Sequence, residues 1–292
     1  MNDGYLDVEQ ILGYEFEASS FNYTDREVIL YALGVGAAKK PLDPQELAFV
    51  YEGSPEGFKA LPTFAVIFPG TMFQQLLQAP GIKFNPMKLL HGEQHLEIIK
   101  PLPTAAQITS RGKISQVYDK GSGALIAIDV NSQDASGDRV AFNRITLFIR
   151  GIGGFGGERG PSTRNLNEAP DREPDAVWQE AVPENQALLY RLSGDRNPLH
   201  ADPAMAAIGG FKRPILHGLC TYGFAARAVL RQFAGNDPHR FASISARFAR
   251  HFFPGETLVT EMWDAGGGAI LFRSKVLERD EFVLTNAKVQ LK

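Results

Sequence analysis

The C-terminal part of the chain contains four segments in which apolar and polar residues alternate, as they do in half-buried β-strands. They are SISARFARHF (243–252), ETLVTEMWD (256–264), AILFRSKVLE (269–278) and FVLTNAKVQL (282–291). Their β-branched content also favours antiparallel strands with one face in water. The stretch HGLCTYGFAARAVLRQFAG (217–235) precedes them and is typical of a buried helix punctuated by glycine. We therefore expect a curled antiparallel sheet whose inner face is covered by this helix.

A similar layout occurs twice, on either side of a segment at 151–175 that is rich in Gly, Pro and charge. YALGVGAAKKPLDP (31–44) aligns without a gap to YRLSGDRNPLHADP (190–203), GFKALP (57–62) resembles GFKRP (210–214), and the strand–turn–strand pattern at 121–149 resembles that at 266–291. Three matches in the same order indicate an internal duplication. The sequence therefore predicts an α+β protein of two repeats, 1–150 and 176–292, joined by a linker at 151–175. Each repeat is expected to wrap a curled sheet around a central helix.

The two repeats differ at two positions that could carry chemistry. The second repeat has Asp195 and His200 where the first has Gly36 and Pro41. The Asn-Pro pair between Asp195 and His200 indicates a rigid loop rather than a continuing helix or strand. An acid and an imidazole can transfer protons near neutral pH, and both repeats would need them if they only held the loop. They are therefore candidate acid–base residues, with a capping or turn role for the aspartate as the alternative.

A second candidate element is the start of the apolar helix, at His217-Gly218. A helix N-terminus offers free backbone N–H groups, and a glycine there lets a ligand approach the backbone closely. This combination would suit an oxyanion hole for a carbonyl group; the alternative is a plain helix start with a glycine for packing. Cys220 is expected to be a buried, apolar-like side chain. The chain has no Gly-x-Ser-x-Gly or Cys-His nucleophile motif, which favours direct acid–base chemistry over a covalent intermediate.

Composition narrows the classes of function. The chain has 292 residues and a net charge of −3, so no basic field favours nucleic acid as a partner. A single cysteine excludes an internal disulfide framework and fits a reducing compartment. The sequence shows no secretory signal and no apolar run near the roughly 20 residues that a membrane span needs. The C-terminal KVQLK differs from a peroxisomal Ser-Lys-Leu address, so we expect a cytoplasmic protein.

Two further motifs do not fit the functions that they suggest. GIGGFG (151–156) matches G-x-G-x-x-G, but GERGPSTRN follows it and cannot open the helix that a dinucleotide site requires. HGEQH (91–95) spaces two histidines four residues apart on an expected strand, but it is not the zinc motif H-E-x-x-H and no third ligand is near it in the sequence. We therefore expect neither a nucleotide cofactor nor a metal ion.

Several of these segments resemble one known family. LLYRLSGDRNPLHADP, GFKRPILHGLCTYGFAARAVL and ARFARHFFPGETLVTEMW are similar to the R-specific 2-enoyl-CoA hydratases, or hydratase 2, of the MaoC-like dehydratase family. KLLHGEQHLEIIKPLP, YDKGSGALI and GIGGFGGERG in the first half and linker resemble the same family, so the resemblance covers nearly the whole chain. It implies a double hot-dog fold, a homodimer, and hydration of trans-2-enoyl-CoA to (3R)-hydroxyacyl-CoA in fatty acid metabolism. The acyl-CoA would be the substrate, with no separate cofactor.

The resemblance also implies roles for individual residues. It makes Asp195 and His200 the catalytic pair that holds a water molecule, and it leaves open which is the base and which the acid. Asn197 would position the water or the pair, and the N–H of Gly218 would polarise the thioester carbonyl. The family positions that contact the CoA substrate are His91, Gly92, Lys120 and Phe248.

Other activities remain alternatives at this point. A hot-dog thioesterase would use the same fold and the same CoA handle, and a non-catalytic acyl-CoA binding module would need no acid–base pair. A dehydratase acting on acyl carrier protein would run the same reaction in reverse. In the first repeat, the loop-rich segments at 45–57 and 58–82 have Gly and Pro where a central helix should be long. We expect them to leave a tunnel for a long acyl tail, and the alternative is that they only fill the core.

Overall fold

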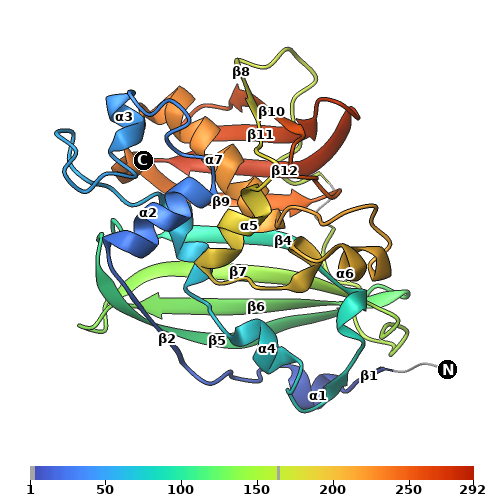
Figure 1. Ribbon diagram of the computed structural model, residues 1–292. Helices are drawn as coiled ribbons and strands as arrows, with labels where there is room; N and C mark the ends of the chain where they lie inside the picture. Colours follow the sequence, from blue (N-terminus) through green and yellow to red (C-terminus); the bar gives the residue numbers. More distant parts are fainter. Residues whose placement is uncertain (1–3, 163–164) are drawn as a thin grey trace.

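Antiparallel strands form one ten-stranded sheet at the centre of the protein, whose computed structural model describes residues 4–162 and 165–292 (Figure 1). The strand order is β2-β5-β6-β7-β4-β9-β12-β11-β10-β8. The strands of the first half are β2 (Ser19–Tyr23), β4 (Leu89–Ile98), β5 (Ala106–Asp119), β6 (Gly123–Gln133) and β7 (Arg139–Arg150). Those of the second half are β8 (Ala176–Ala181), β9 (Phe241–Phe248), β10 (Thr257–Asp264), β11 (Ala269–Val276) and β12 (Glu281–Leu291). Each half therefore contributes one side of the sheet.

The two halves join where β4 pairs with β9, with Gln94 opposite Ala246 and Leu96 opposite Ile244. The hairpin β6–β7 lies in the first half and the hairpin β11–β12 in the second, at the places where the sequence repeat predicts them. Strand β11 alternates strictly between partly and fully buried residues, as expected for a strand with one face on a core. The predicted duplication is thus confirmed in the architecture, which is a double hot-dog fold.

Helix α7 (Gly218–Ala234) is the central helix of the second half and contacts β9, β10 and β12 (Figure 1). Most of its residues are buried, which explains why its sequence is apolar nearly all round. It ends at Gly235, whose left-handed backbone (φ 60°) lets its N–H close the last turn on the carbonyl of Leu230. The helix predicted at 217–235 is therefore confirmed.

The first half has no equivalent long helix. The short helices η1 (Pro62–Ile67) and α4 (Met72–Leu76) stand in its place, because Pro69 and Gly70 interrupt the segment between them. The expectation that each repeat wraps a central helix is therefore met only in the second repeat. Phe64 and Phe68 pack edge to face with ring centroids 5.4 Å apart, so these residues contribute to the core. This agrees with the alternative that the segment at 58–82 fills the core. The acyl tunnel stays a prediction.

Matched segments of the two repeats also meet in space. Helix α2 (Asp25–Gly34) begins with a capping box between Thr24 and Glu27, and it packs against α5 (Gln186–Tyr190). The rings of Tyr31 and Tyr190, which the repeat aligns, lie 6.1 Å apart. The remaining elements are β1 (Tyr5–Leu6), α1 (Val8–Ile11), α3 (Pro44–Leu47), β3 (Ile82–Lys83), η2 (Pro86–Lys88), η3 (Arg191–Ser193), η4 (Pro198–His200), α6 (Pro203–Ile208) and η5 (Pro238–Arg240).

Strand β9 is shorter than predicted, ending at Phe248 rather than at residue 252. Beyond it, the N–H of Ala249 still bonds to Val283, but the carbonyl of Phe252 turns to accept from Leu216, just before α7. Within the described parts of 151–175 the chain forms neither helix nor strand, and β8 follows it. In the described part of the chain, no helix has the length and apolar character required to cross a membrane.

Candidate active site

The loop that carries Asp195 and His200 is built by two short side-chain-to-backbone turns. Oδ1 of Asp195 accepts from the N–H of Asn197 at 3.0 Å, and Oδ1 of Asn197 accepts from Leu199 at 3.0 Å, which caps η4. Asp195 thus has the turn role that the sequence left as an alternative, while its second oxygen accepts no hydrogen bond from a described residue. Asn197 fixes the helical turn at whose end His200 lies. Both functional groups are consequently held by one rigid loop.

His200 is 8% exposed, and its Nδ1 lies 2.9 Å from the carbonyl oxygen of Ile215. Because a carbonyl oxygen only accepts, Nδ1 must carry the proton, and the neutral ring keeps its lone pair on Nε2. Burial lowers the pKa of this imidazole below its usual 6.5. His200 is therefore neutral near pH 7 and able to accept a proton at Nε2.

His217 joins this pair, which sequence reasoning did not anticipate. Its ring lies on that of His200 with centroids 3.7 Å apart, and its Nε2 donates to the backbone carbonyl of Asp195 at 3.1 Å. The ring of Tyr190 contacts it as well, at 4.9 Å. Burial, reinforced by His200, lowers the pKa of His217 to about 3. In the sequence His217 is only the neighbour of Gly218, and no spacing rule indicates that its ring points back to Asp195.

The first half contributes His91 across the junction of β4 and β9. Its ring lies 4.8 Å from that of Phe248, and burial lowers its pKa to about 4. The negative charge of Asp195 raises the pKa values of His91, His200 and His217, against the lowering by burial. The carboxylate therefore lies near all three rings. Gly92 occupies the bulge in β4 where the register with β7 shifts. Two predicted substrate contacts, His91 and Phe248, therefore lie beside the loop that carries Asp195 and His200.

The start of α7 presents backbone donors next to these rings. The N–H groups of Cys220 and Thr221 both bond to the carbonyl of His217, whereas the first N–H groups of a helix have no acceptor within it. Gly218 is exposed, and a Cβ there would lie 3.1 Å from the ring of Phe248. Gly218 is therefore the candidate donor to a carbonyl oxygen at this end of the helix. Cys220 is 0% exposed and burial raises its pKa, which confirms the predicted buried, apolar-like thiol.

The absence of an acid from the first repeat has a physical cause. Gly36 aligns with Asp195 and has a left-handed backbone with φ 81°. A Cβ on Gly36 would lie 2.3 Å from the ring of Phe224 and 3.2 Å from Nη1 of Arg227, both of which come from α7. The central helix of the second repeat therefore fills the place that an acidic side chain would need in the first.

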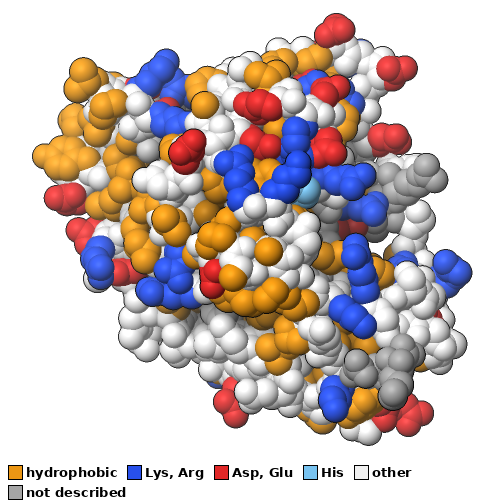
Figure 2. Space-filling view, turned by 45° about the vertical axis from the view of Figure 1, so that its right-hand side comes forward, with side chains coloured by type: hydrophobic (Ala, Val, Ile, Leu, Met, Phe, Trp, Pro, Cys, Tyr) orange, Lys and Arg blue, Asp and Glu red, His pale blue; other side chains and the backbone are white. Residues whose placement is uncertain are grey.

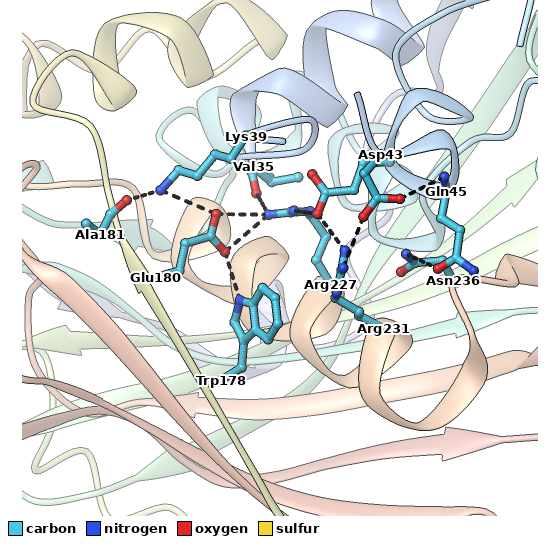
Figure 3. A network of polar contacts seen from close by, with 11 residues as sticks. Val35, Lys39, Asp43, Gln45, Trp178, Glu180, Ala181, Arg227, Arg231 and Asn236 are labelled. Carbon is cyan, nitrogen blue, oxygen red and sulfur yellow. Dashed lines mark hydrogen bonds and ion pairs between the residues drawn. The ribbon is translucent and has the colours of Figure 1, made fainter. Parts of the chain in front are cut away.

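A buried network of ion pairs fixes the first repeat's segment around α3 against α7 and β8 (Figure 3). Arg227 lies 3.4 Å from Glu180 and 3.7 Å from Glu46, and Arg231 binds Glu46 at 2.8 Å and Asp43 at 3.0 Å. Glu46 and Glu180 are both more than nine-tenths buried, so their charges depend on these arginines. The network lies on the same helix as Phe224 and holds the two repeats together there.

The same cluster could in principle hold a metal ion. The ligand atoms of Asp195, His200 and His217 lie within 4.8 Å of one another, and no other such group of three occurs in the described part of the chain. An imidazole binds a metal through a lone pair in its ring plane, and two rings stacked at 28° do not aim those lone pairs at one point. The geometry favours proton transfer. Lys120, the remaining predicted contact, lies in the β5–β6 hairpin.

Two repeated half-sheets, with an acid–imidazole pair beside the N-terminus of the second repeat's helix, define a double hot-dog protein of the MaoC-like type. Residues 21–151 match the MFE-2 hydratase 2 N-terminal domain, and residues 165–287 match the MaoC like domain. The chain is 47% identical over 285 residues to a protein named probable enoyl-CoA hydratase 2 of Dictyostelium discoideum, covering 96% of this chain and 95% of that protein. The chain belongs to the enoyl-CoA hydratase 2 family.

Other relatives extend this similarity. The chain is 48% identical to part of the mouse peroxisomal multifunctional enzyme type 2, of which it spans 38%, and that alignment covers 96% of this chain. Among solved structures, the MaoC-like dehydratase from Phytophthora capsici is 35% identical with a TM-score of 0.86, over 98% of this chain and 99% of that one. The full-length multifunctional enzyme type 2 from Drosophila melanogaster gives a TM-score of 0.80 at 44% identity, over 94% of this chain and 48% of that one.

Proposed function

We propose that this protein is a hydro-lyase that adds water across the 2,3 double bond of trans-2-enoyl-CoA and forms (3R)-3-hydroxyacyl-CoA in fatty acid β-oxidation. The observation that carries the proposal is the convergence of the Asp195 carboxylate and the neutral His200 ring beside the N-terminus of α7. Relatives named enoyl-CoA hydratase 2 in Dictyostelium and Arabidopsis, with 95% of their lengths covered, support the substrate class.

The chemistry follows from the charge that develops on the substrate. The thioester carbonyl makes the β-carbon electrophilic, and the N–H of Gly218 donates to the carbonyl oxygen as it gains enolate character. A water molecule between the Asp195 carboxylate and Nε2 of His200 faces two acceptors. As its oxygen bonds to the β-carbon, one of the two groups takes its proton, and the pair delivers a proton to the α-carbon. Addition is syn if one water supplies both groups, and the R configuration is carried over from the family.

One assay separates hydratase activity from the alternatives. Purified protein is mixed with crotonyl-CoA, and the enoyl absorbance and free thiol are followed together. Loss of the absorbance with the thioester intact is the expected result, and the product should be oxidised only by an R-specific 3-hydroxyacyl-CoA dehydrogenase. Release of free CoA would indicate a thioesterase, and no change would indicate a binding module; either result overturns the proposal. Activity on acyl carrier protein thioesters alone would indicate a dehydratase of that class.

We also infer a homodimer in the cytoplasm. Leu33, Leu188 and Leu192 are large apolar side chains exposed on the adjoining elements α2, α5 and η3, and a second subunit would cover them. The single, buried cysteine fits a reducing compartment. Light scattering on the purified protein tests the first statement. A fluorescent fusion tests the second, and its localisation in peroxisomes, as the name of the Arabidopsis relative indicates for that protein, would contradict it.

A further inference from the structure

The Gly-rich loop at 151–160 matches a nucleotide-binding motif, but its backbone donors bind a carboxylate of the protein itself. Oδ1 of Asp119 accepts from the N–H groups of Gly154 at 2.9 Å and Gly121 at 2.8 Å, and Oδ2 accepts from Gly156 at 2.9 Å. Asp119 is 6% exposed. The N–H of Gly154, with the other donors, lowers the pKa of this carboxyl group. Asp119 thus occupies the backbone nest in which a phosphate would otherwise bind.

This loop fits closely onto the β5–β6 hairpin. A Cβ at Gly153 would lie 2.5 Å from the carbonyl oxygen of Gly123, so two backbones cross there without room for a side chain. A Cβ at Gly160 would lie 2.5 Å from the ring of Tyr118. The carboxylate of Asp119 accepts hydrogen bonds from both the loop and the hairpin. Its negative charge therefore fixes the position of the loop on the hairpin.

Two ammonium groups border the clamped loop. Lys120 directly follows Asp119, its Nζ donates to the carbonyl of Arg159, and it lies 5.6 Å from the ring of Tyr118. Nζ of Lys88 would lie 3.3 Å from a Cβ placed at Gly151. Lys88 ends η2 immediately before β4, the strand that brings His91 to the candidate active site. Figure 2 shows Lys and Arg side chains gathered on both sides of a hollow in the face that it presents.

We propose that Asp119 is a positioning residue that holds the Gly-rich loop so that Lys120 and Lys88 face the phosphate groups of the CoA thioester. This inference rests on the function proposed above. Because the N–H groups of the loop are already bonded to Asp119, the phosphates meet ammonium point charges rather than a backbone nest. Asp119 acts through the lysines and does not touch the reacting carbons.

Two substrates separate positioning from a general structural role. Crotonyl-CoA carries the phosphates, and the crotonyl thioester of N-acetylcysteamine carries the same reacting carbons without them. Asp119→Asn keeps the size of the side chain but turns an amide toward N–H donors. We expect KM for crotonyl-CoA to rise about tenfold, the equivalent of one lost charged contact, with kcat nearly unchanged. Activity of the variant on the short thioester should equal that of the wild type.

The matched control is Asp134→Asn. Asp134 also accepts from two backbone N–H groups, those of Ser136 and Asp138, each at 3.0 Å, but in the hairpin at the opposite end of β6. It should leave both substrates unaffected. Lys120→Met removes one charge and the hydrogen bond to Arg159 but leaves the bonds from Asp119 to the loop in place. It should raise KM for crotonyl-CoA alone even if Asp119→Asn does not fold.

An equal loss of kcat/KM on the two substrates in Asp119→Asn would overturn the positioning role. A wild-type KM for crotonyl-CoA in Lys120→Met would overturn it as well. Failure of the proposed function gives a different result, because the wild-type protein would then hydrate neither thioester.

Discussion

The imidazole rings of His200 and His217 lie almost face to face, with centroids 3.7 Å and planes 28° apart. Each ring donates one N–H to a backbone carbonyl, His200 to Ile215 and His217 to Asp195. The backbone thus selects the tautomer of both rings, and burial keeps both neutral near pH 7. The stack joins the Asp195–His200 loop to the start of α7, so the proposed acid–base groups and the proposed oxyanion donors are positioned by one contact.

Stability should depend on pH because of this stack. Above about pH 6.5, the ordinary pKa of histidine, both folded and unfolded chains hold the two rings neutral, and the folded state has its full stability. As the pH falls below that value, the unfolded chain takes up protons that the folded chain cannot, since burial keeps the pKa of His217 at about 3 and lowers that of His200. Each ring should then lower the free energy of unfolding by up to about 1.4 kcal/mol per pH unit.

Urea titrations at several pH values between about 7.5 and 5 measure this slope. His217→Asn removes one of the two buried rings, so its free energy of unfolding should depend less steeply on pH. An unchanged slope in that variant would show that His217 is not the group that titrates.

Asp195→Asn and His200→Ala should each remove most of the hydratase activity without unfolding the protein. Loss of one acid–base group commonly lowers kcat by about 10²–10⁴-fold, and a pair that acts as a unit loses little more when both are replaced. Stopped assays with crotonyl-CoA give kcat for the two single variants and the double variant. A folded single variant that turns over at the wild-type rate would end the proposed mechanism.

Gly218 tests the oxyanion donor. Gly218→Arg places a long side chain where the thioester oxygen must meet the backbone, and we expect loss of activity with partial loss of stability. Gly218→Ala adds one methyl group, 3.1 Å from the Phe248 ring, at a position where a helix tolerates alanine. It should lower kcat by less than the roughly 10²–10³-fold that loss of an oxyanion donor costs. Normal kinetics in Gly218→Arg would refute the assignment.

The predicted acyl tunnel can be tested by substrate length. Each buried CH₂ is worth about 0.8 kcal/mol, so kcat/KM should rise from crotonyl-CoA to medium and long enoyl-CoAs if the first repeat receives the tail. Ala65 is fully buried in the core cluster that also contains Phe64 and Phe68. Ala65→Trp should suppress long substrates and spare crotonyl-CoA, and Ala65→Val is the milder variant if the larger ring unfolds the core. A wild-type preference for crotonyl-CoA would leave the first repeat as a structural partner only.

Arg227→Met should be strongly destabilising, because it leaves Glu46 and Glu180 buried without one of their cations. Removing one partner of a buried ion pair typically costs about 3–5 kcal/mol, whereas an exposed pair contributes about 0–1 kcal/mol. Arg26→Met is the matched control, since the Arg26 side chain is 84% exposed in its pair with Glu27. Denaturant titration of both variants measures the difference, and similar losses in the two would show that the network does not join the repeats.

Much of the fold could be predicted from the sequence, because the duplication repeats the same segments in the same order in both halves of the chain. The strands at 256–264, 269–278 and 282–291 and the helix at 217–235 follow from alternation and apolar content, and the structure confirms them. The Asp195–His200 loop was found because its counterpart in the first repeat lacks both groups. The structure brings them together, and their catalytic roles stay a proposal.

Other features depend on contacts that no spacing in the sequence encodes. His217 and His200 are seventeen positions apart, and only the turn before α7 stacks their rings. Asp119 resembles any aspartate at a hairpin until the Gly-rich loop, more than thirty residues later, folds onto it. Strand β9 ends before the predicted residue 252 because Ala249 and Arg250 break its apolar–polar alternation, and the backbone of Phe252 pairs with Leu216 instead.

The contact between Gly36 and Phe224 bears on the history of the two repeats. An aspartate at position 36 would have to displace an aromatic ring from the middle of α7 and adopt a backbone conformation that favours glycine. No single substitution can therefore return the acid to the first repeat without damage to the second. A side chain at position 36 would therefore require a second change, one that makes room at position 224.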